Sequence, residues 1–382
     1  MNPVEFSGSN ESTKMSVIEN LGGQWVTFFE GEQSGNGLVS FNTFGSSGGY
    51  ASLYQQKNPD KATGAVLLQG RTTSVTCTDT SFEFTIEPTN ESTPSLVKVA
   101  GRRGSQEPKD AWAGEWNSTD NLIGTFKMIK LKPRRVEGAV PRIESWNNFS
   151  DWVEAQSTNN AVYRGLGSSQ HLLVSTAHRA GIFDLHHYLF EILPRVRAEL
   201  LKRHGLRINL SEPDGLAEML ALIRHHGFPS PIMDWSNSPW VALYFAIASF
   251  NTLKANPNAP DFCRIYRLQH SGIFVDADVQ GTLLAPSIER KLVEIPTPMT
   301  SRVTAQEGVF LLTPCVDVLI DIEHEQRQNN NVLIDAIDID VRMVDQAQRR
   351  LDQMMINEAT MLSSIDSTLS HLRKKFTFAG EV

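Results

Sequence analysis

The chain of 382 residues is short of cysteine, of long apolar runs and of excess charge, and each shortage excludes a class of protein. Its three cysteines, Cys77, Cys263 and Cys315, are widely spaced, so they form neither a disulfide framework nor a metal-ligand motif. The longest apolar run, Trp240 to Phe250, is far shorter than the roughly 20 residues that cross a bilayer. The first residues show no secretion signal. Together these features predict a cytoplasmic protein without a membrane span or a metal site.

Length and charge set two further limits. A net charge of −8 is not the overall positive charge that favours binding to nucleic acid or to an anionic membrane, so neither partner is indicated. A chain of 382 residues is longer than one compact core usually is, and two domains are expected.

Residues 1–132 have the sequence pattern of an antiparallel β domain. Short runs rich in Val, Thr, Phe and Leu are separated by Gly, Asn, Ser and Asp, and no helical period is evident. In the segment Phe82 to Ile86, apolar and polar residues alternate, which places one face in a core. A meander of such strands closes into a barrel or packs as a sandwich and so hides its edges. We expect this domain to sense or bind a partner, such as another protein.

The pattern of apolar and polar residues changes after a basic, proline-containing segment, Lys130 to Val136. We place a linker at residues 133–144 and an α+β domain at residues 145–382. Ser238 and Pro239 suit the start of a helix, so a buried helix is predicted from Trp240 to Ser249. A helix from Leu185 to Arg203 is expected to kink or break at Pro194. The run Val316 to Asp321 is predicted to be a strand.

Several polar motifs follow one another in this second domain. They are Tyr163-Arg164-Gly165, Ser175 to Arg179, His225-His226-Gly227 running through Asp234-Trp235-Ser236 into Ala242 to Ala246, and Gln306-Glu307-Gly308. In this order they resemble the FRG-domain family over about residues 145–375. Two departures stand out: Arg224 occupies a position that is usually Gln, and Ser230 to Met233 replaces Thr-Arg-Leu-Leu, so the role of that family arginine is open here.

The layout also resembles, more distantly, the ADP-ribosyltransferase fold. In that fold a first strand presents Arg or His, a second ends in a Ser/Thr motif that leads into a helix, and a later strand starts with Glu or Gln. The corresponding residues here are Arg164, the segment Asp234 to Ser236, and Gln306-Glu307. The resemblance implies NAD as the cofactor or substrate, and ADP-ribosyl transfer or NAD hydrolysis as the reaction, in a toxin-like or phage-defence effector.

Cleavage of the nicotinamide–ribose bond requires a cation for the pyrophosphate, an aromatic wall for the nicotinamide and an acceptor for the ribose. The candidates for the cation are Arg164 and Arg179; for the wall, Tyr163, Trp235 and Tyr244; for the acceptor, Gln306, Glu307 and Asp234, with Ser236 beside them. Glutamate stabilises a cationic transition state better than glutamine does. If Gln306 alone pointed inward, we would expect weak catalysis or none.

Two other functions remain open. Arg164 and Asp234 could be a structural ion pair in a binding or scaffold module without enzymatic activity. Alternatively, His225 could act as the general base of a nucleotide or RNA hydrolase. Each candidate also has a structural explanation, since Ser236 and Ser238 suit helix caps and His225 suits the negative end of a helix.

Overall fold

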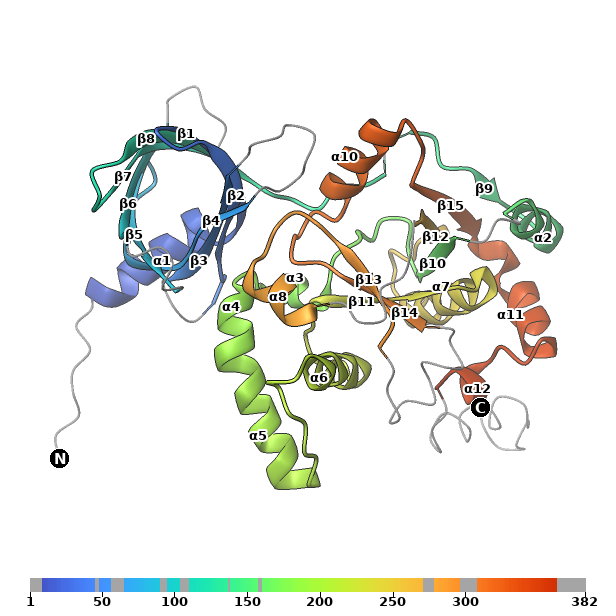
Figure 1. The fold of residues 1–382 in the computed structure, drawn as a ribbon. Helices are drawn as coiled ribbons and strands as arrows, with labels where there is room; N and C mark the ends of the chain where they lie inside the picture. Colours follow the sequence, from blue (N-terminus) through green and yellow to red (C-terminus); the bar gives the residue numbers. More distant parts are fainter. Residues whose placement is uncertain are drawn as a thin grey trace.

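The computed structural model describes residues 9–44, 48–55, 65–89, 95–103, 110–136, 138–156, 160–270, 278–295 and 308–362. The N-terminal part is a closed barrel, and the C-terminal part is a mixed sheet covered by helices (Figure 1). The barrel confirms one of the two β architectures expected from the sequence. The mixture of helices and strands confirms the composition expected of the second domain.

Eight antiparallel strands form the barrel, each paired with its neighbour along the chain and the first with the last. They are β1 (Gly23–Gly31), β2 (Gly35–Phe41), β3 (Gly49–Gln55), β4 (Ala65–Cys77), β5 (Ser81–Pro88), β6 (Val97–Arg102), β7 (Ala111–Ser118) and β8 (Ile123–Lys130). Closure of the sheet leaves no edge strand on which another chain can pair.

A helix precedes the barrel where the sequence analysis expected only strands. This helix, α1 (Ser9–Leu21), buries Val17 and Leu21 against the barrel core. The indole of Trp25, fully buried at the start of β1, donates a hydrogen bond of 2.7 Å to the carbonyl oxygen of Leu21. The side-chain hydroxyl of Ser16 bonds to the carbonyl oxygen of Cys77 at the end of β4. The helix therefore covers one end of the barrel.

The C-terminal part is built on a seven-stranded sheet in the order β13-β14-β11-β10-β12-β15-β9. Its strands are β9 (Arg142–Ile143), β10 (Ala161–Leu166), β11 (Ile232–Ser236), β12 (Phe262–Gln269), β13 (Lys291–Val293), β14 (Gly308–Leu312) and β15 (Ile334–Asp340). All described pairs are antiparallel except the short contact of β15 with β9. The central strand of the sheet is β10, with β11 on one side and β12 on the other.

Helices occupy the connections between these strands, and two more follow the last strand, β15. They are α2 (Trp146–Ala155), α3 (Thr176–Arg179), α4 (Leu185–His187), α5 (Leu193–His204), α6 (Pro213–His225), α7 (Pro239–Leu253), α8 (Val279–Leu284), α10 (Leu319–Asn329), α11 (Val344–Gln353) and α12 (Glu358–Leu362). A π-helical stretch, Tyr188–Ile192, joins α4 to α5, and Pro194 lies in the first turn of α5. The expected break at this proline is thus a change of helix type within one rod (Figure 1).

The helix α7 packs directly on β10. Ser238 caps α7 through its hydroxyl, which accepts a hydrogen bond from the Val241 amide, as the sequence predicted. A Cβ atom at Gly165 would lie 1.9 Å from the carbonyl oxygen of Ala242 and 2.7 Å from the amide nitrogen of Ala246. Only glycine allows the two backbones to approach so closely, which explains the last residue of the Tyr-Arg-Gly motif.

One expected strand is wrong. Val316 to Asp321 leads into helix α10, which starts at Leu319. Leu319 and Ile322, one turn apart, are buried on the same side of this helix. A short apolar run cannot distinguish a strand from a buried helix start by period alone, and here the helix places these two residues in the core.

Polar contacts join the barrel to the C-terminal part. The fully buried side chain of Gln24 donates to the carbonyl oxygen of Pro314 and accepts from the amide of Val316, each at 2.8 Å. The hydroxyl of Tyr54 donates to the carbonyl oxygen of Ala285 at 2.6 Å. Outward-facing side chains of β1 and β3 are therefore buried by the neighbouring domain.

A second contact involves the segment between α3 and α4. The side-chain oxygen of Asn42 accepts hydrogen bonds from the amides of Phe183 and Asp184 at 2.8 and 2.9 Å. Tyr50 stacks on His186 with ring centroids 4.5 Å apart. This segment begins directly after α3, so the barrel holds a loop that adjoins the candidate site described below.

Candidate functional site

The sheet opens between its central strand, β10, and the neighbouring strand β11. Among the described residues, β10 and β11 pair only at Tyr163 and Ser236, although each strand pairs along most of its length with its other neighbour. Continued antiparallel pairing would bring Arg164 opposite Trp235 and Gly165 opposite Asp234. These positions do not pair, so the strands diverge where the Tyr-Arg-Gly and Asp-Trp-Ser motifs face each other.

A cavity of about 400 Å³ lies along this opening. Seven candidate residues from the sequence line it: Tyr163, Arg164, Arg179, His225, Asp234, Trp235 and Ser236. The lining also includes Arg224 and His171, the α7 residues Ala242, Phe245 and Ser249, and Leu362 at the end of α12. Residues far apart in the chain are thus brought together at the middle of one sheet.

Arg164 fills the gap between the diverging strands. Its guanidinium donates a short hydrogen bond to the main-chain carbonyl oxygen of Asp234, in place of the missing ladder bond. Burial lowers the pKa of Arg164 to about 10, and the cations Arg224 and Arg179 act in the same direction, whereas Asp234 opposes the shift. Arg164 therefore remains protonated at neutral pH.

The carboxylate of Asp234 pairs with a different arginine. Arg224 Nη2 lies 2.6 Å from Asp234 Oδ2, and the side chains are 19% and 44% exposed, respectively. The expected alternative of an Arg164–Asp234 ion pair is therefore replaced by a main-chain bond from Arg164 and a carboxylate bond from Arg224. Sequence reasoning noted Arg224 only as a departure from the family pattern. Its place in the last turn of α6, directly before the first motif histidine, was the available signal.

Arg179 reaches the cavity from the short helix α3. The hydroxyl of Ser175 caps this helix by accepting from the His178 amide at 3.2 Å. Thr176 and Ser230 hold α3 beside the segment that leads into β11, through bonds of 3.0 and 3.2 Å at the Thr176 hydroxyl. Burial and the neighbouring Arg224 lower the pKa of Arg179. The Ser175 to Arg179 motif thus places a third arginine on the cavity.

The cavity is cationic. Among the described residues that line it, three are arginines and Asp234 is the one carboxylate. Burial and Arg179 lower the pKa of His171, so this imidazole is neutral at pH 7. The partly buried ring of Phe245 on α7 supplies aromatic surface, whereas Trp235 and Tyr163 are 3% and 5% exposed and pack in the core. Clustered guanidinium groups beside an aromatic ring suit an anionic ligand that carries a planar group.

The remaining candidates have diverse positions. The buried Ser236 hydroxyl accepts from the Ser238 amide at 3.0 Å and so shapes the turn before α7. His225 lines the cavity, with its ring 4.9 Å from that of His226. Tyr244 packs with the core around α7 and is not among the described lining residues. Gln306 and Glu307 lie outside the described residues.

Within the described part of the chain, no group of three His, Cys, Asp or Glu side chains is arranged to hold a metal ion. None of its helices is both long enough and apolar enough to span a membrane.

Comparison with known proteins identifies the domain that holds the cavity. Residues 159–255 match the family model of the FRG domain, and the chain therefore carries an FRG domain in its C-terminal part. This match includes β10, α3, α6, β11 and α7, and hence nearly all the described lining of the cavity. No curated protein matched the sequence.

Solved structures similar to part of the chain include two designed β-barrels and a biotin complex. A redesigned β-barrel is 15% identical in sequence. The match covers 31% of this chain and 96% of the barrel's chain, with a TM-score of 0.23. A de novo designed fluorescence-activating β-barrel is 13% identical in sequence. The match covers 30% of this chain and 98% of the designed chain, with a TM-score of 0.23. The chain in the rhizavidin–biotin complex is 11% identical in sequence. The match covers 31% of this chain and 98% of that chain, with a TM-score of 0.19.

Proposed function

We propose that the FRG domain binds NAD or a related nucleotide in the cavity between β10 and β11. The observation that carries this proposal is the convergence of Arg164, Arg179 and Arg224 on one cavity with a single described carboxylate. Guanidinium groups bind phosphate oxygens in bidentate fashion, and two or three of them match a pyrophosphate. The partly buried ring of Phe245 offers a surface on which a base can stack.

The proposed reaction is cleavage of the nicotinamide–ribose bond. The bond between ribose C1′ and the pyridinium nitrogen breaks, its electron pair neutralises the nicotinamide, and positive charge develops on the ribose. Water, or a hydroxyl or amine of an acceptor, then forms a bond to C1′ and gives up a proton. A carboxylate that faces C1′ stabilises the charge, and a carboxylate or imidazole takes the proton.

The residues divide these roles in the proposal. The arginines hold the pyrophosphate, and the half-exposed Asp234 is the described carboxylate available to the ribose. His225, which lines the cavity, is a candidate for the base. Gln306 and Glu307 immediately precede Gly308, which pairs with Ser236 of the cavity, so they complete the proposed acceptor set. This arrangement follows the order of motifs in the ADP-ribosyltransferase fold that the sequence resembles, and an effector of that kind is the role we propose.

The test is incubation of the purified chain with NAD, alone and with candidate protein acceptors, while free nicotinamide is measured. We expect release by the wild type and loss of release in Arg164→Ala. Arg195→Ala is the matched control, because Arg195 is 82% exposed on α5 and lies outside the cavity. Separate variants of Gln306, Glu307 and His225 then assign the acceptor and the base.

A binding module without catalysis gives a different result. In that case NAD, or ADP-ribose as a probe, binds in calorimetry and depends on Arg164, but no nicotinamide is released. Absence of both binding and release would overturn the proposal. A turnover that survives His225→Asn would exclude His225 as the general base.

A further inference from the structure

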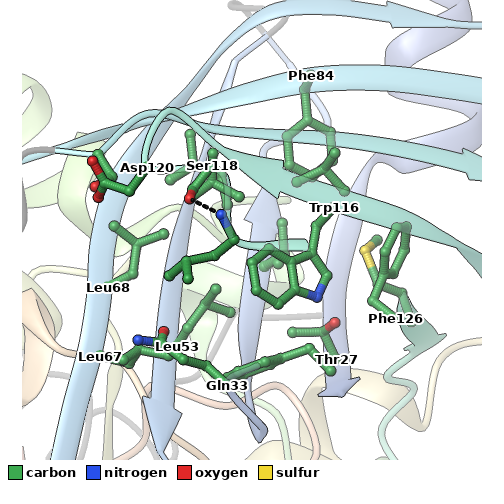
Figure 2. Close-up of a pocket in the computed structure, with 18 residues that line it drawn as sticks. Thr27, Gln33, Leu53, Leu67, Leu68, Phe84, Trp116, Ser118, Asp120 and Phe126 are labelled. Carbon is green, nitrogen blue, oxygen red and sulfur yellow. Dashed lines mark hydrogen bonds between the residues drawn. The ribbon is translucent and has the colours of Figure 1, made fainter. Parts of the chain in front are cut away.

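A second cavity lies inside the barrel. It has a volume of about 270 Å³ and is formed where β1, β5 and β7 end and β4 and β6 begin (Figure 2). The helix α1 covers the other end, because Ser16 bonds to the carbonyl of Cys77, at the end of β4. The barrel is therefore filled by α1 and core side chains at one end and hollow toward the other.

The wall of this cavity is mainly apolar and aromatic. Phe29, Phe84, Trp116 and Phe126 line it together with leucines, valines and Met128. The nearly buried Leu68 and Phe84 are 3% exposed each, so the lining belongs to the barrel core as well as to the cavity. Such a surface favours a ligand that is itself largely apolar.

One polar group in the wall lacks a partner. Trp116 is 91% buried, and its indole nitrogen makes no hydrogen bond within the described part of the chain. Figure 2 shows the indole on the inner surface of the barrel between Phe84 and Thr27. A Cβ at Gly124 would lie 2.5 Å from this nitrogen, so this edge of the ring packs against the β8 backbone. The nitrogen has almost no accessible surface, so a ligand in the cavity meets the apolar part of the indole and not its N–H group.

The charge of the lining sets the ligand class. Among the described lining residues, Asp120 is the one charged group, and no arginine, lysine or histidine is present. Asp120 is exposed in the turn between β7 and β8, where the Ser118 hydroxyl accepts from the Leu122 amide at 3.2 Å. An anion is therefore disfavoured here, in contrast to the three-arginine cavity of the FRG domain.

We propose that the barrel is a binding site for a small neutral molecule that is apolar over most of its surface. An apolar cavity of about 150 Å³ holds benzene. The 270 Å³ cavity scales to a one- or two-ring molecule of roughly ten non-hydrogen atoms. This ligand differs in class from the nucleotide proposed for the FRG domain, and the two sites can be tested separately.

Isothermal titration calorimetry of the full chain with three matched probes tests this site. Naphthalene is apolar throughout, β-naphthol is neutral and carries one hydroxyl group, and β-naphthoate is the anionic counterpart. We expect both neutral probes to bind, because the cavity wall is mainly apolar. β-Naphthoate should bind at least about tenfold more weakly than β-naphthol, because no cation lines the described wall and Asp120 repels an anion.

Two variants fill the cavity from different strands. Leu68→Trp and Val97→Trp place an indole where the ligand would lie and should abolish β-naphthol binding while the melting temperature is kept or raised. Ile123→Trp is the matched control, since Ile123 is 63% exposed and is not among the described lining residues. It should bind β-naphthol as the wild type does.

The outcome separates the two sites of the molecule. Arg164→Ala should leave β-naphthol binding unchanged. The inference is overturned if no probe binds, if the folded cavity-filling variants still bind, or if β-naphthoate binds best and depends on Arg164. Failure of the NAD assay has no bearing on these results.

Discussion

Asp234 shows how single residues set the character of the FRG-domain cavity. Its main-chain oxygen receives Arg164 and its carboxylate receives Arg224, so one residue orients two of the three arginines. Because the carboxylate is 44% exposed, the pair contributes little to stability, on the order of 1 kcal/mol or less. Its larger effect is on the electrostatic potential of the cavity.

Replacement of Arg224 tests this electrostatic role. In Arg224→Gln one cation is lost and the carboxylate of Asp234 is left unpaired, so affinity for inorganic pyrophosphate should fall by about tenfold to a hundredfold. Calorimetry at low and high salt measures the change. Asp234→Asn should change the affinity in the opposite direction and strengthen pyrophosphate binding, because it removes the one carboxylate among the described lining residues. Unchanged affinity in both variants would place the anion elsewhere.

His178 predicts a pH dependence of stability. It is 4% exposed, its ring nitrogens have no hydrogen-bond partner in the described structure, and burial lowers its pKa from 6.5 to about 4. The folded state therefore favours neutral imidazole, and this contribution is complete above pH 6.5 and is lost as pH falls through 4. The loss amounts to about 3 kcal/mol. Urea unfolding between pH 4 and 7 measures it, and His178→Leu should reduce the slope.

Asp184 changes the pH dependence of stability in the opposite direction, because its contribution is lost as pH rises. Burial raises its pKa from 3.8 to about 6, so its contribution is complete below pH 3.8 and is lost as pH rises through 6. Asp184→Asn retains an acceptor for the His187 amide at the start of α4 and should increase stability at pH 7. If both variants left the pH profile unchanged, the titration of these two buried groups would not govern stability in this range.

At the scale of elements, the close approach of α7 to β10 controls the shape of the cavity. Gly165→Ala would force a Cβ atom into the carbonyl oxygen of Ala242, 1.9 Å away, and the helix must shift. We expect a loss of about 1 to 3 kcal/mol or more in the free energy of unfolding, the range for overpacked sites. Chemical denaturation measures the loss. Gly205→Ala is a control in which no atom lies within 4 Å, although its φ of 69° adds its own backbone cost.

The elements also differ in how far sequence predicted them. The Ser238-Pro239 start of α7 was predicted correctly, because a cap and a proline at the first turn are local signals. The start of α10 was mistaken for a strand, because the apolar run before it fits either structure. Helix α1 was missed because its role is to cover the barrel, and its two buried apolar side chains, Val17 and Leu21, give little periodicity.

At the scale of the whole molecule, Gln24 links the two parts. Its amide satisfies both the Pro314 carbonyl and the Val316 amide from a fully buried position. Gln24→Ala leaves both groups without this partner, and we expect a loss of about 2 to 4 kcal/mol. Differential scanning calorimetry should show a lower melting temperature or two separated transitions. Asn117→Ala, at an exposed position of the barrel, should change neither. An unaltered transition in Gln24→Ala would show that the contact does not stabilise the molecule.

The sequence was sufficient to predict the β character of the first domain, the FRG-domain motifs and seven of the residues that line the cavity. These features are local, since alternation, capping and motif spacing are written in neighbouring positions. Only the tertiary structure decided that the meander closes into a barrel with a hollow end. It also decided that Arg224 rather than Arg164 neutralises Asp234, and that β10 and β11 part to form a cavity. Those outcomes depend on strand pairing and on contacts between residues distant in the chain, which no local pattern specifies.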